Sequence, residues 1–245
     1  MIRGMARLLV GTSGYSFKQW KGNFYPADLS DKDMLAFYSR ALPAVEINYT
    51  FRHLPSEKSI TGWAEATPPE FVFVLKASQR ITHILRLKDA GEAAQTFMTA
   101  ASGLGPKLGP VLFQLPPFQR KDAARLATFL GDLPAGPRYA FEFRHESWFD
   151  GEVEELLRSR GASLCINETE DFCPAIVTTA PFAYIRLRSA SYSPAEIAAW
   201  GGRIRELLGR EIDVFAFFKH EDEGPRYAQA LQQAAAADVS IGPSE

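Results

Sequence analysis

Residues 182–188 read Phe-Ala-Tyr-Ile-Arg-Leu-Arg, and this stretch carries the two features that decide the fold. A short run rich in apolar, β-branched and aromatic residues predicts a buried β-strand. Because side chains alternate between the two faces of a strand, Tyr184, Arg186 and Arg188 share one face. Charged groups packed under helices would be costly, so we expect this face to point into the open end of a β-barrel.

Seven further runs of the same kind surround this one, at Leu8–Ser13, Ala44–Asn48, Phe71–Lys76, Pro110–Leu115, Tyr139–Arg144, Ser163–Asn167 and Asp213–Lys219. Helical stretches separate them, and several begin after Ser, Asp or Pro, as helix starts do. The predicted helices are Asp31–Ala41, Ser56–Ala66, Asp89–Leu104, Asp122–Leu130, Gly151–Arg160, Pro194–Leu208 and Gly224–Ala237. Only Glu168–Ala180 connects two strands without a convincing helix. Eight strands alternating with helices predict an α/β protein, a single-domain (β/α)8 TIM barrel over residues 1–245.

Composition and charge limit the classes of protein to which this chain can belong. With 46% hydrophobic and 23% charged residues the chain is expected to be a folded globular protein, which excludes disorder. The net charge of -2 argues against the basic surface of a dedicated nucleic-acid binder, although it leaves a local basic cleft open. Cys165 and Cys173 are too few for a disulfide scaffold and favour the cytoplasm.

Two further expectations concern membranes and the ends of the chain. No apolar run approaches the ~18 residues of a membrane span, and Met1–Val10 lacks a signal-peptide core. The tail Ala234–Glu245 is predicted to be a frayed helix end.

Polar side chains end every predicted strand, which is where the catalytic residues of a TIM barrel lie. We expect Glu46 or Glu142 to act as acid or base, Lys76 as an electrophile and His83 as a further acid or base. The alternative for any one of these is a salt bridge or hydrogen bond that only closes the top of the barrel. The expected ligand-binding residues are Ser13, Trp20, Asn48, Gln114, Arg144, Trp148, Arg186, Arg188 and His220.

The predicted mouth is net positive, because Lys76 and three arginines face two glutamates. An anionic ligand, phosphate or carboxylate, follows, with Arg144 and Arg186 as clamps. Trp20, Tyr25 and Trp148 lie in loops where a ring can either stack on a sugar or base or pack over the rim of the barrel.

No cofactor is expected from the motifs. A metal held by Glu46, His83, Glu142 and His220 is not favoured, because cations flank these residues. The stretch Gly-Thr-Ser-Gly at residues 11–14 lacks the Lys and the third Gly of phosphate-binding loops and is interpreted as a tight βα turn.

Read together, six motifs resemble the DUF72 family, also called YecE-like proteins, over nearly the whole chain. They are GTSGY at 11–15, WKGNFYP at 20–26, VEINYTF at 45–51, Lys76 with Thr82-His83, LFQLPP at 112–117 and FEFRHESW at 141–148. The resemblance implies a TIM barrel, in agreement with the strand count, but it implies no reaction because the family is one of unknown function. It marks Ser13, Glu46, Asn48, Lys76, His83, Gln114, Glu142, Arg144 and Trp148 as positions that match family motifs.

The last third of the chain departs from the family pattern. The family usually has His-Gly where this chain has Arg188-Ser189, and Phe-Asn-Asn where it has Phe218-Lys219-His220. Both departures change the chemistry of the mouth, so the ligand or the mechanism can differ from those of relatives.

These observations favour an enzyme that acts on a small anionic substrate, such as a phosphorylated or carboxylated sugar, and leave hydrolase, lyase and isomerase open. One alternative is a barrel that binds nucleic acid or processes phosphodiesters, with Trp20, Tyr25 and Trp148 stacking on bases. Another is a ligand-binding protein without catalysis. The oligomeric state is left open.

Overall fold

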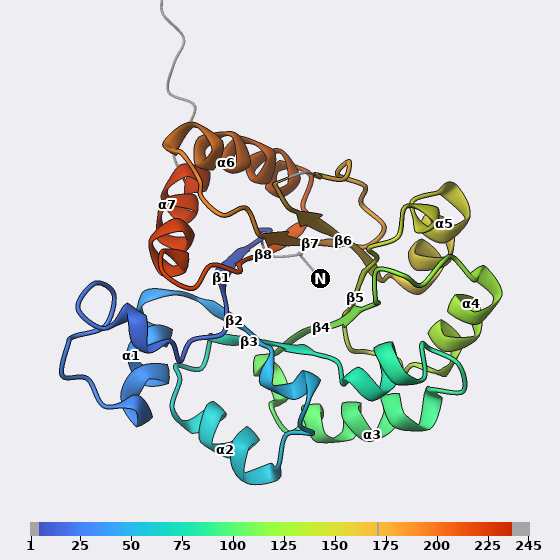
Figure 1. The fold of residues 1–245 in the computed structure, drawn as a ribbon, viewed down its shortest axis with the longest axis horizontal. Coiled ribbons are helices and arrows are strands. Elements are labelled where there is room, and N and C mark those ends of the chain that lie inside the picture. The colour runs from blue at the N-terminus through green and yellow to red at the C-terminus, as the bar shows by residue number, and fades with distance from the viewer. Residues whose placement is uncertain (1–4, 171, 237–245) are drawn as a thin grey trace, which may run out of the picture.

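The protein folds as a closed barrel of eight parallel strands in sequential order, seen end-on in Figure 1. A computed structural model describes residues 5–170 and 172–236. The strands are β1 (Leu8–Ser13), β2 (Ala44–Ile47), β3 (Val72–Lys76), β4 (Leu108–Gln114), β5 (Tyr139–Glu142), β6 (Ser163–Glu168), β7 (Phe182–Leu187) and β8 (Asp213–Phe218). β8 pairs with β1 and closes the ring, so the predicted TIM barrel is confirmed.

Seven α-helices surround the barrel in the described part of the chain (Figure 1). They are α1 (Met34–Ala41), α2 (Glu57–Glu65), α3 (Gly91–Ser102), α4 (Ala123–Asp132), α5 (Gly151–Arg160), α6 (Pro194–Gly209) and α7 (Gly224–Ala236). The described residues between β6 and β7 contain no helix, as predicted. The predicted frayed helix end at 234–245 lies mostly outside the described residues.

Local chemistry explains where several elements begin. Ser56, Asp122 and Asp150 each accept a backbone N–H of the helix that follows, and Ser193 forms a reciprocal capping box with Glu196 at the start of α6. The tight turn predicted after β1 is present. Gly14 in this turn has a φ of +104°, a backbone conformation that residues with a side chain rarely adopt.

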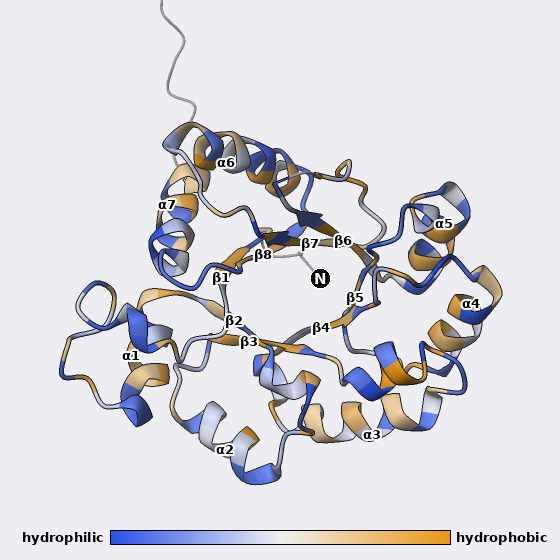
Figure 2. Ribbon diagram, in the orientation of Figure 1, coloured by the Kyte–Doolittle hydropathy of each residue, from blue (hydrophilic) through white to orange (hydrophobic). Residues whose placement is uncertain are grey.

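The core has two parts that the strands separate. Apolar residues that point inward, such as Leu9, Val74 and Phe217, fill the lower barrel, and a larger cluster lies between the strands and the helices. Figure 2 shows the strands mainly in hydrophobic colours, with blue along β7, which carries Arg186. The inward polar residues lie at the carboxyl ends of the strands, above this apolar plug.

No helix in the described part of the chain has the length and apolar character that crossing a membrane requires.

Candidate functional site at the barrel mouth

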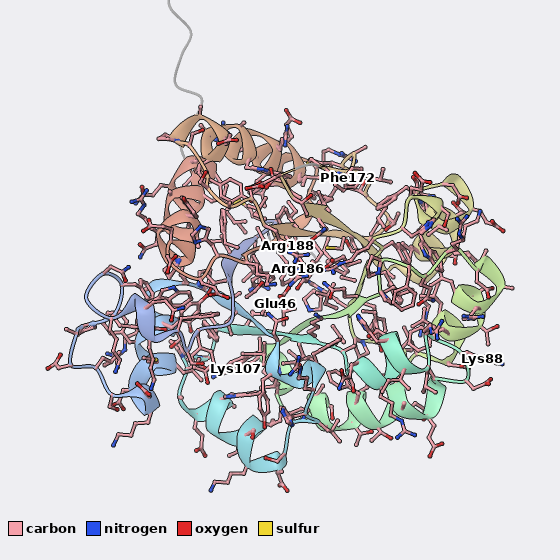
Figure 3. The ribbon with its side chains drawn as sticks, in the orientation of Figure 1. Glu46, Lys88, Lys107, Phe172, Arg186 and Arg188 are labelled. Atoms are coloured by element: carbon pink, nitrogen blue, oxygen red, sulfur yellow. The ribbon has the colours of Figure 1, made fainter. Side chains whose placement is uncertain are left out.

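The register of the sheet brings the polar strand ends together. Ser13 lies beside Glu46 across β1 and β2, and Gln114 lies beside Glu142 across β4 and β5. Arg186 enters from β7 on the other side of the barrel. Figure 3 shows Glu46, Arg186 and Arg188 converging at the centre of the ring of strands. The alternation argument thus correctly predicts the face on which these residues lie.

Arg186 bridges the two glutamates at the floor of the mouth. Its Nη2 donates to Glu46 Oε1 at 2.8 Å and its Nη1 donates to Glu142 Oε2 at 2.5 Å. All three side chains are fully buried or nearly so, with side-chain exposures of 2%, 0% and 0%. Its Nε has no hydrogen-bond partner. The pair of carboxylates therefore neutralises and positions a buried guanidinium.

Glu46 is surrounded by donors from β1, from β7 and from the residue that follows β2. Its Oε1 accepts hydrogen bonds from Ser13 Oγ at 2.7 Å and Asn48 Nδ2 at 3.3 Å, and its Oε2 accepts one from Tyr184 Oη at 2.7 Å. Burial opposes the charge of this carboxylate, but Arg186 and the hydrogen bonds outweigh burial, so the pKa of Glu46 is lowered. Glu46 is therefore ionised at neutral pH.

Glu142 is held in the same way on the opposite side of Arg186. Its Oε1 accepts from Arg144 Nε at 2.8 Å, and its Oε2 accepts from Gln114 Nε2 at 2.8 Å. Burial again opposes ionisation, but Arg186 and Arg144 lower the pKa of Glu142 to about 2. Every oxygen of the two carboxylates accepts at least one hydrogen bond, an arrangement that suits a fixed negative charge better than a proton donor.

Lys76 extends from the end of β3 over this floor. Its Nζ donates to Gln114 Oε1 at 2.8 Å and lies 4.1 Å from the centre of the Phe51 ring. Burial, followed by the positive charge of Arg186, lowers the pKa of Lys76 to about 8. The amine is thus poised to change its charge close to neutral pH.

A cavity of about 410 Å³ opens above the floor, and seven of the predicted site residues line it: Ser13, Asn48, Lys76, Gln114, Arg144, Arg186 and Arg188. Arg52 and Lys219 complete a strongly cationic wall. His53 and the rings of Phe17, Tyr49 and Phe51 form the rest of the lining. No Asp or Glu belongs to the described lining. The two glutamates lie behind the arginines that they hold.

His220 does not line this cavity, contrary to the prediction. Its Nδ1 accepts the backbone N–H groups of Asp222 and Glu223, and its Nε2 lies 2.7 Å from the carbonyl of Ala190. The ring is thus fully engaged with backbone at the start of α7. Lys219 occupies the cavity instead, because Phe215 and Phe217 face the barrel interior and the alternation continues to residue 219.

His83 stands beside the cavity and not in its described lining. It lies on a one-turn π-helix, Arg80–Ile84, where its Nδ1 is 2.9 Å from Thr82 Oγ1 and its ring meets the Phe51 ring edge-on. Burial, and then the charge of Lys76, lower the pKa of His83. A neutral imidazole is therefore its ordinary form at pH 7.

The two tryptophans expected to bind ligand belong to the core. Trp20 and Trp148 are 0% and 1% exposed, and their indole N–H groups donate to the carbonyls of Glu221 and Gln119. Trp148 also stacks on Phe143 with ring centres 4.4 Å apart. Tyr25 is buried as well. Of the two roles that the sequence left open, these rings therefore have the packing role at the rim of the barrel. No ring face of the three is free to stack on a ligand.

Sequence reasoning missed the segment that follows β2. Tyr49, Arg52 and His53 reach the cavity from a short turn of 3-10 helix, Tyr49–Phe51, and its continuation. Tyr49 and His53 stack with ring centres 4.6 Å apart. Strand alternation does not extend into such a turn, but the cluster of aromatic and basic residues directly after a strand end was a usable signal.

Within residues 5–170 and 172–236, no group of three or more His, Cys, Asp and Glu side chains is arranged to hold a metal ion.

Comparison with known proteins places this barrel among relatives. Residues 9–244 match the family model described as "Protein of unknown function DUF72". The chain is 33% identical over 125 residues to the UPF0759 protein YecE of Escherichia coli K12, covering 51% of this chain and 46% of YecE. It is 30% identical over 154 residues to the UPF0759 protein YunF of Bacillus subtilis, covering 58% of this chain and 52% of YunF. The matches thus span about half the length of these curated relatives.

Solved structures agree over a longer stretch. A DUF72 family protein from Thermotoga maritima superposes with a TM-score of 0.79 at 25% identity, over 94% of this chain and all of that one. A DUF72 family protein from Enterococcus faecalis superposes with a TM-score of 0.72 at 19% identity, over 97% of this chain and all of that one, and shows the shared fold alone.

Proposed function

The chain belongs to the DUF72 family of proteins of unknown function, and from this premise we propose that its barrel mouth binds a small phosphorylated or carboxylated molecule and acts on it as an enzyme. One observation carries the proposal. Six cationic side chains line the cavity, whereas the two carboxylates that pair with them in the described part of the chain are buried beneath. The surplus is four positive charges: Arg52, Lys76, Arg144, Arg186, Arg188 and Lys219 against Glu46 and Glu142.

The burial of the carboxylates supports anion binding. A carboxylate at the cavity surface would repel an anionic ligand, but Glu46 and Glu142 are fully buried. They hold Arg186 and Arg144 in fixed orientations, so less side-chain entropy is lost when a ligand binds. This role of the two glutamates in holding arginines differs from the acid and base roles expected from the sequence. Ionised, fully hydrogen-bonded carboxylates are poor proton donors at neutral pH.

The cavity size supports a small ligand. A volume of about 410 Å³ falls in the range of small-molecule sites, which is about 300–1,000 Å³. The nucleic-acid alternative loses the three rings that it relied on, because Trp20, Tyr25 and Trp148 are buried.

Thermal unfolding in phosphate or sulfate tests the proposal. A ligand that binds only the folded state stabilises it by about 2.7 kcal/mol at a hundredfold excess over its dissociation constant. The melting temperature should rise more in phosphate than in chloride of equal ionic strength. Arg188→Gln should lose most of this rise, since it removes a cation of the cavity wall while Glu142 keeps its closer partners.

The matched control is Arg158→Gln, which removes a cation from the surface of α5. It should keep the full phosphate effect. A phosphate effect no greater than that of chloride, or one equal in Arg188→Gln and the unaltered protein, would contradict the proposal.

A further inference from the structure

Lys76 is placed as a nucleophile and not only as a positive charge. We propose that its amine forms a covalent imine with an aldehyde or ketone group of the anionic ligand. This inference rests on the proposed function, because the surrounding cations would hold the acidic group of the ligand while its carbonyl carbon meets Nζ.

The partners of Lys76 are unusual for a lysine in a charged site. Its Nζ donates to the neutral amide oxygen of Gln114, and no carboxylate of the described residues lies within the 4.0 Å of an ion pair. Among the charged neighbours, Arg186 has the largest effect and lowers the pKa of Lys76, whereas Glu46 and Glu142 oppose it from beyond ion-pair distance. A lysine without a carboxylate partner, buried beside cations, is the arrangement that favours a free amine.

Gln114 is oriented by Glu142, and this orientation fixes what Lys76 can do. Gln114 Nε2 must donate to the ionised Glu142 Oε2, so Gln114 Oε1 faces Lys76 as an acceptor only. The amine satisfies that acceptor with one N–H. In its neutral form it keeps a second N–H and a lone pair, and the lone pair is free to attack a carbonyl carbon.

Burial, helped by the charge of Arg186, supplies the free amine near neutral pH. With its pKa at about 8, roughly one Lys76 in ten is neutral at pH 7, compared with about one in several thousand for an ordinary lysine. Nζ is held between the Gln114 amide oxygen and the face of the Phe51 ring, at the lining of the cavity. The nucleophile is therefore both positioned and partly deprotonated.

The chemical step is balanced without an oxidant or metal. The neutral Nζ attacks the carbonyl carbon, a C–N bond forms, and the electron pair of the C=O double bond moves to oxygen. Transfer of a proton from nitrogen to oxygen gives a neutral carbinolamine. The hydroxyl group then takes one proton from solvent and leaves as water, and a protonated imine remains, so the amine, the carbonyl compound and one proton yield the iminium ion and water.

Lys219 is the natural comparison within the same cavity. Lys219 is more exposed than Lys76, and no side-chain hydrogen bond holds its amine among the described residues. Its amine is still partly buried, and this partial burial, followed by the charge of Arg188, lowers the pKa of Lys219 as well. The two lysines thus share the cationic cavity but differ in burial and orientation. A comparison of their rates of modification therefore tests the geometry of Lys76 itself.

Reductive trapping tests the inference. The full chain is incubated with pyridoxal 5′-phosphate, an aldehyde that carries a phosphate, and treated with borohydride, which reduces an imine to a stable secondary amine. Peptide mapping by mass spectrometry then identifies the modified lysine. We expect Lys76 to be modified at least about tenfold faster than any other lysine, with a rate that rises around pH 8.

Variants and a matched probe make the result specific. Lys76→Arg should abolish the dominant adduct, whereas Lys219→Arg, which keeps the charge, should leave Lys76 as the main site. Pyridoxal without the phosphate should react much more slowly, and inorganic phosphate should protect Lys76. Gln114→Glu should move the pH dependence upward, because a carboxylate against the ammonium group raises its pKa.

Failure of this inference and failure of the proposed function give different results. If phosphate raises the melting temperature but Lys76 is not modified faster than surface lysines, the anion site stands and the imine is overturned. If phosphate neither stabilises the protein nor protects Lys76, the anion site fails and the inference falls with it.

Discussion

Among the side chains of the mouth, Arg186 has the largest influence on the folded state, because two buried carboxylates depend on it. Removing one partner of a buried ion pair leaves an uncompensated charge and costs about 3–5 kcal/mol. We expect Arg186→Met to lower the free energy of unfolding by about this amount, as measured by urea denaturation. Arg158→Met, at an exposed ion pair on α5, should change it by less than about 1 kcal/mol. Similar losses in the two variants would show that the buried network contributes little.

The same network predicts how stability depends on pH. The folded-state pKa of Glu142 is lowered to about 2, and that of Glu46 is lowered as well. A carboxyl group with a lowered pKa stabilises the fold above its unfolded pKa of about 4.3, and this contribution disappears as the pH falls through the folded value. The free energy of unfolding should therefore decrease between about pH 4.5 and pH 2, with a contribution on the order of 3 kcal/mol from Glu142.

Urea denaturation across this range measures the effect. The control is Glu206→Gln, which removes an exposed carboxylate on the surface of α6. The free energy of unfolding of this variant should fall with decreasing pH in the same way as that of the unaltered protein. Stability that stays constant down to pH 3 would mean that the folded-state pKa values of these carboxyl groups are not lowered.

At the end of β8, two consecutive residues have different roles, and only the first of them reaches the cavity. Lys219 continues the inward face of Phe215 and Phe217, whereas His220 turns to the backbone of α7. We expect Lys219→Gln to weaken phosphate binding by about tenfold, the effect of losing about 1.4 kcal/mol at a cationic site. His220→Gln should leave the phosphate affinity within about twofold. Calorimetric titration with phosphate measures both, and a larger loss in His220→Gln would contradict this assignment.

The elements also show which parts of the site the sequence could reveal. Strands such as β5 alternate visibly, so Glu142 and its neighbours could be assigned to the mouth in advance. β8 is apolar on both faces, as buried parallel strands are, and its sequence gives no alternation from which to count to Lys219. Trp20 and Trp148 were ambiguous because their burial depends on neighbouring rings and also on distant segments, whose carbonyl groups accept the indole N–H groups.

For the molecule as a whole, the distribution of charge matters more than its total. The chain has a net charge of -2, yet its barrel mouth carries a surplus of positive charge. A cationic patch confined to one cavity suits a small ligand better than a nucleic-acid backbone, which needs an extended basic surface. The eight-stranded order that creates this cavity was predictable, because each βα unit repeats the same pattern of local signals.

Oligonucleotide binding tests this difference. We expect a labelled single-stranded oligonucleotide to bind weakly near physiological salt, with a small dependence on salt concentration. A protein that follows the backbone through several contacts would lose affinity with a slope of about -0.7 per contacted phosphate. Fluorescence anisotropy at two salt concentrations distinguishes the two cases. Submicromolar binding at the higher concentration that is lost in Lys76→Ala would favour the nucleic-acid alternative.

The shared burial of Glu46, Arg186 and Glu142 also constrains how this protein can diverge over evolutionary time. A lineage that replaces one of the three alone passes through a poorly folded intermediate, so these positions should change together or remain fixed. Arg52 and Lys219 line the same cavity without holding a buried partner in the described structure, and they can be exchanged singly. Changes in ligand preference should therefore begin with residues at the rim of the mouth, such as Arg52 and Lys219. The floor residues Glu46, Arg186 and Glu142 should stay the same among related proteins.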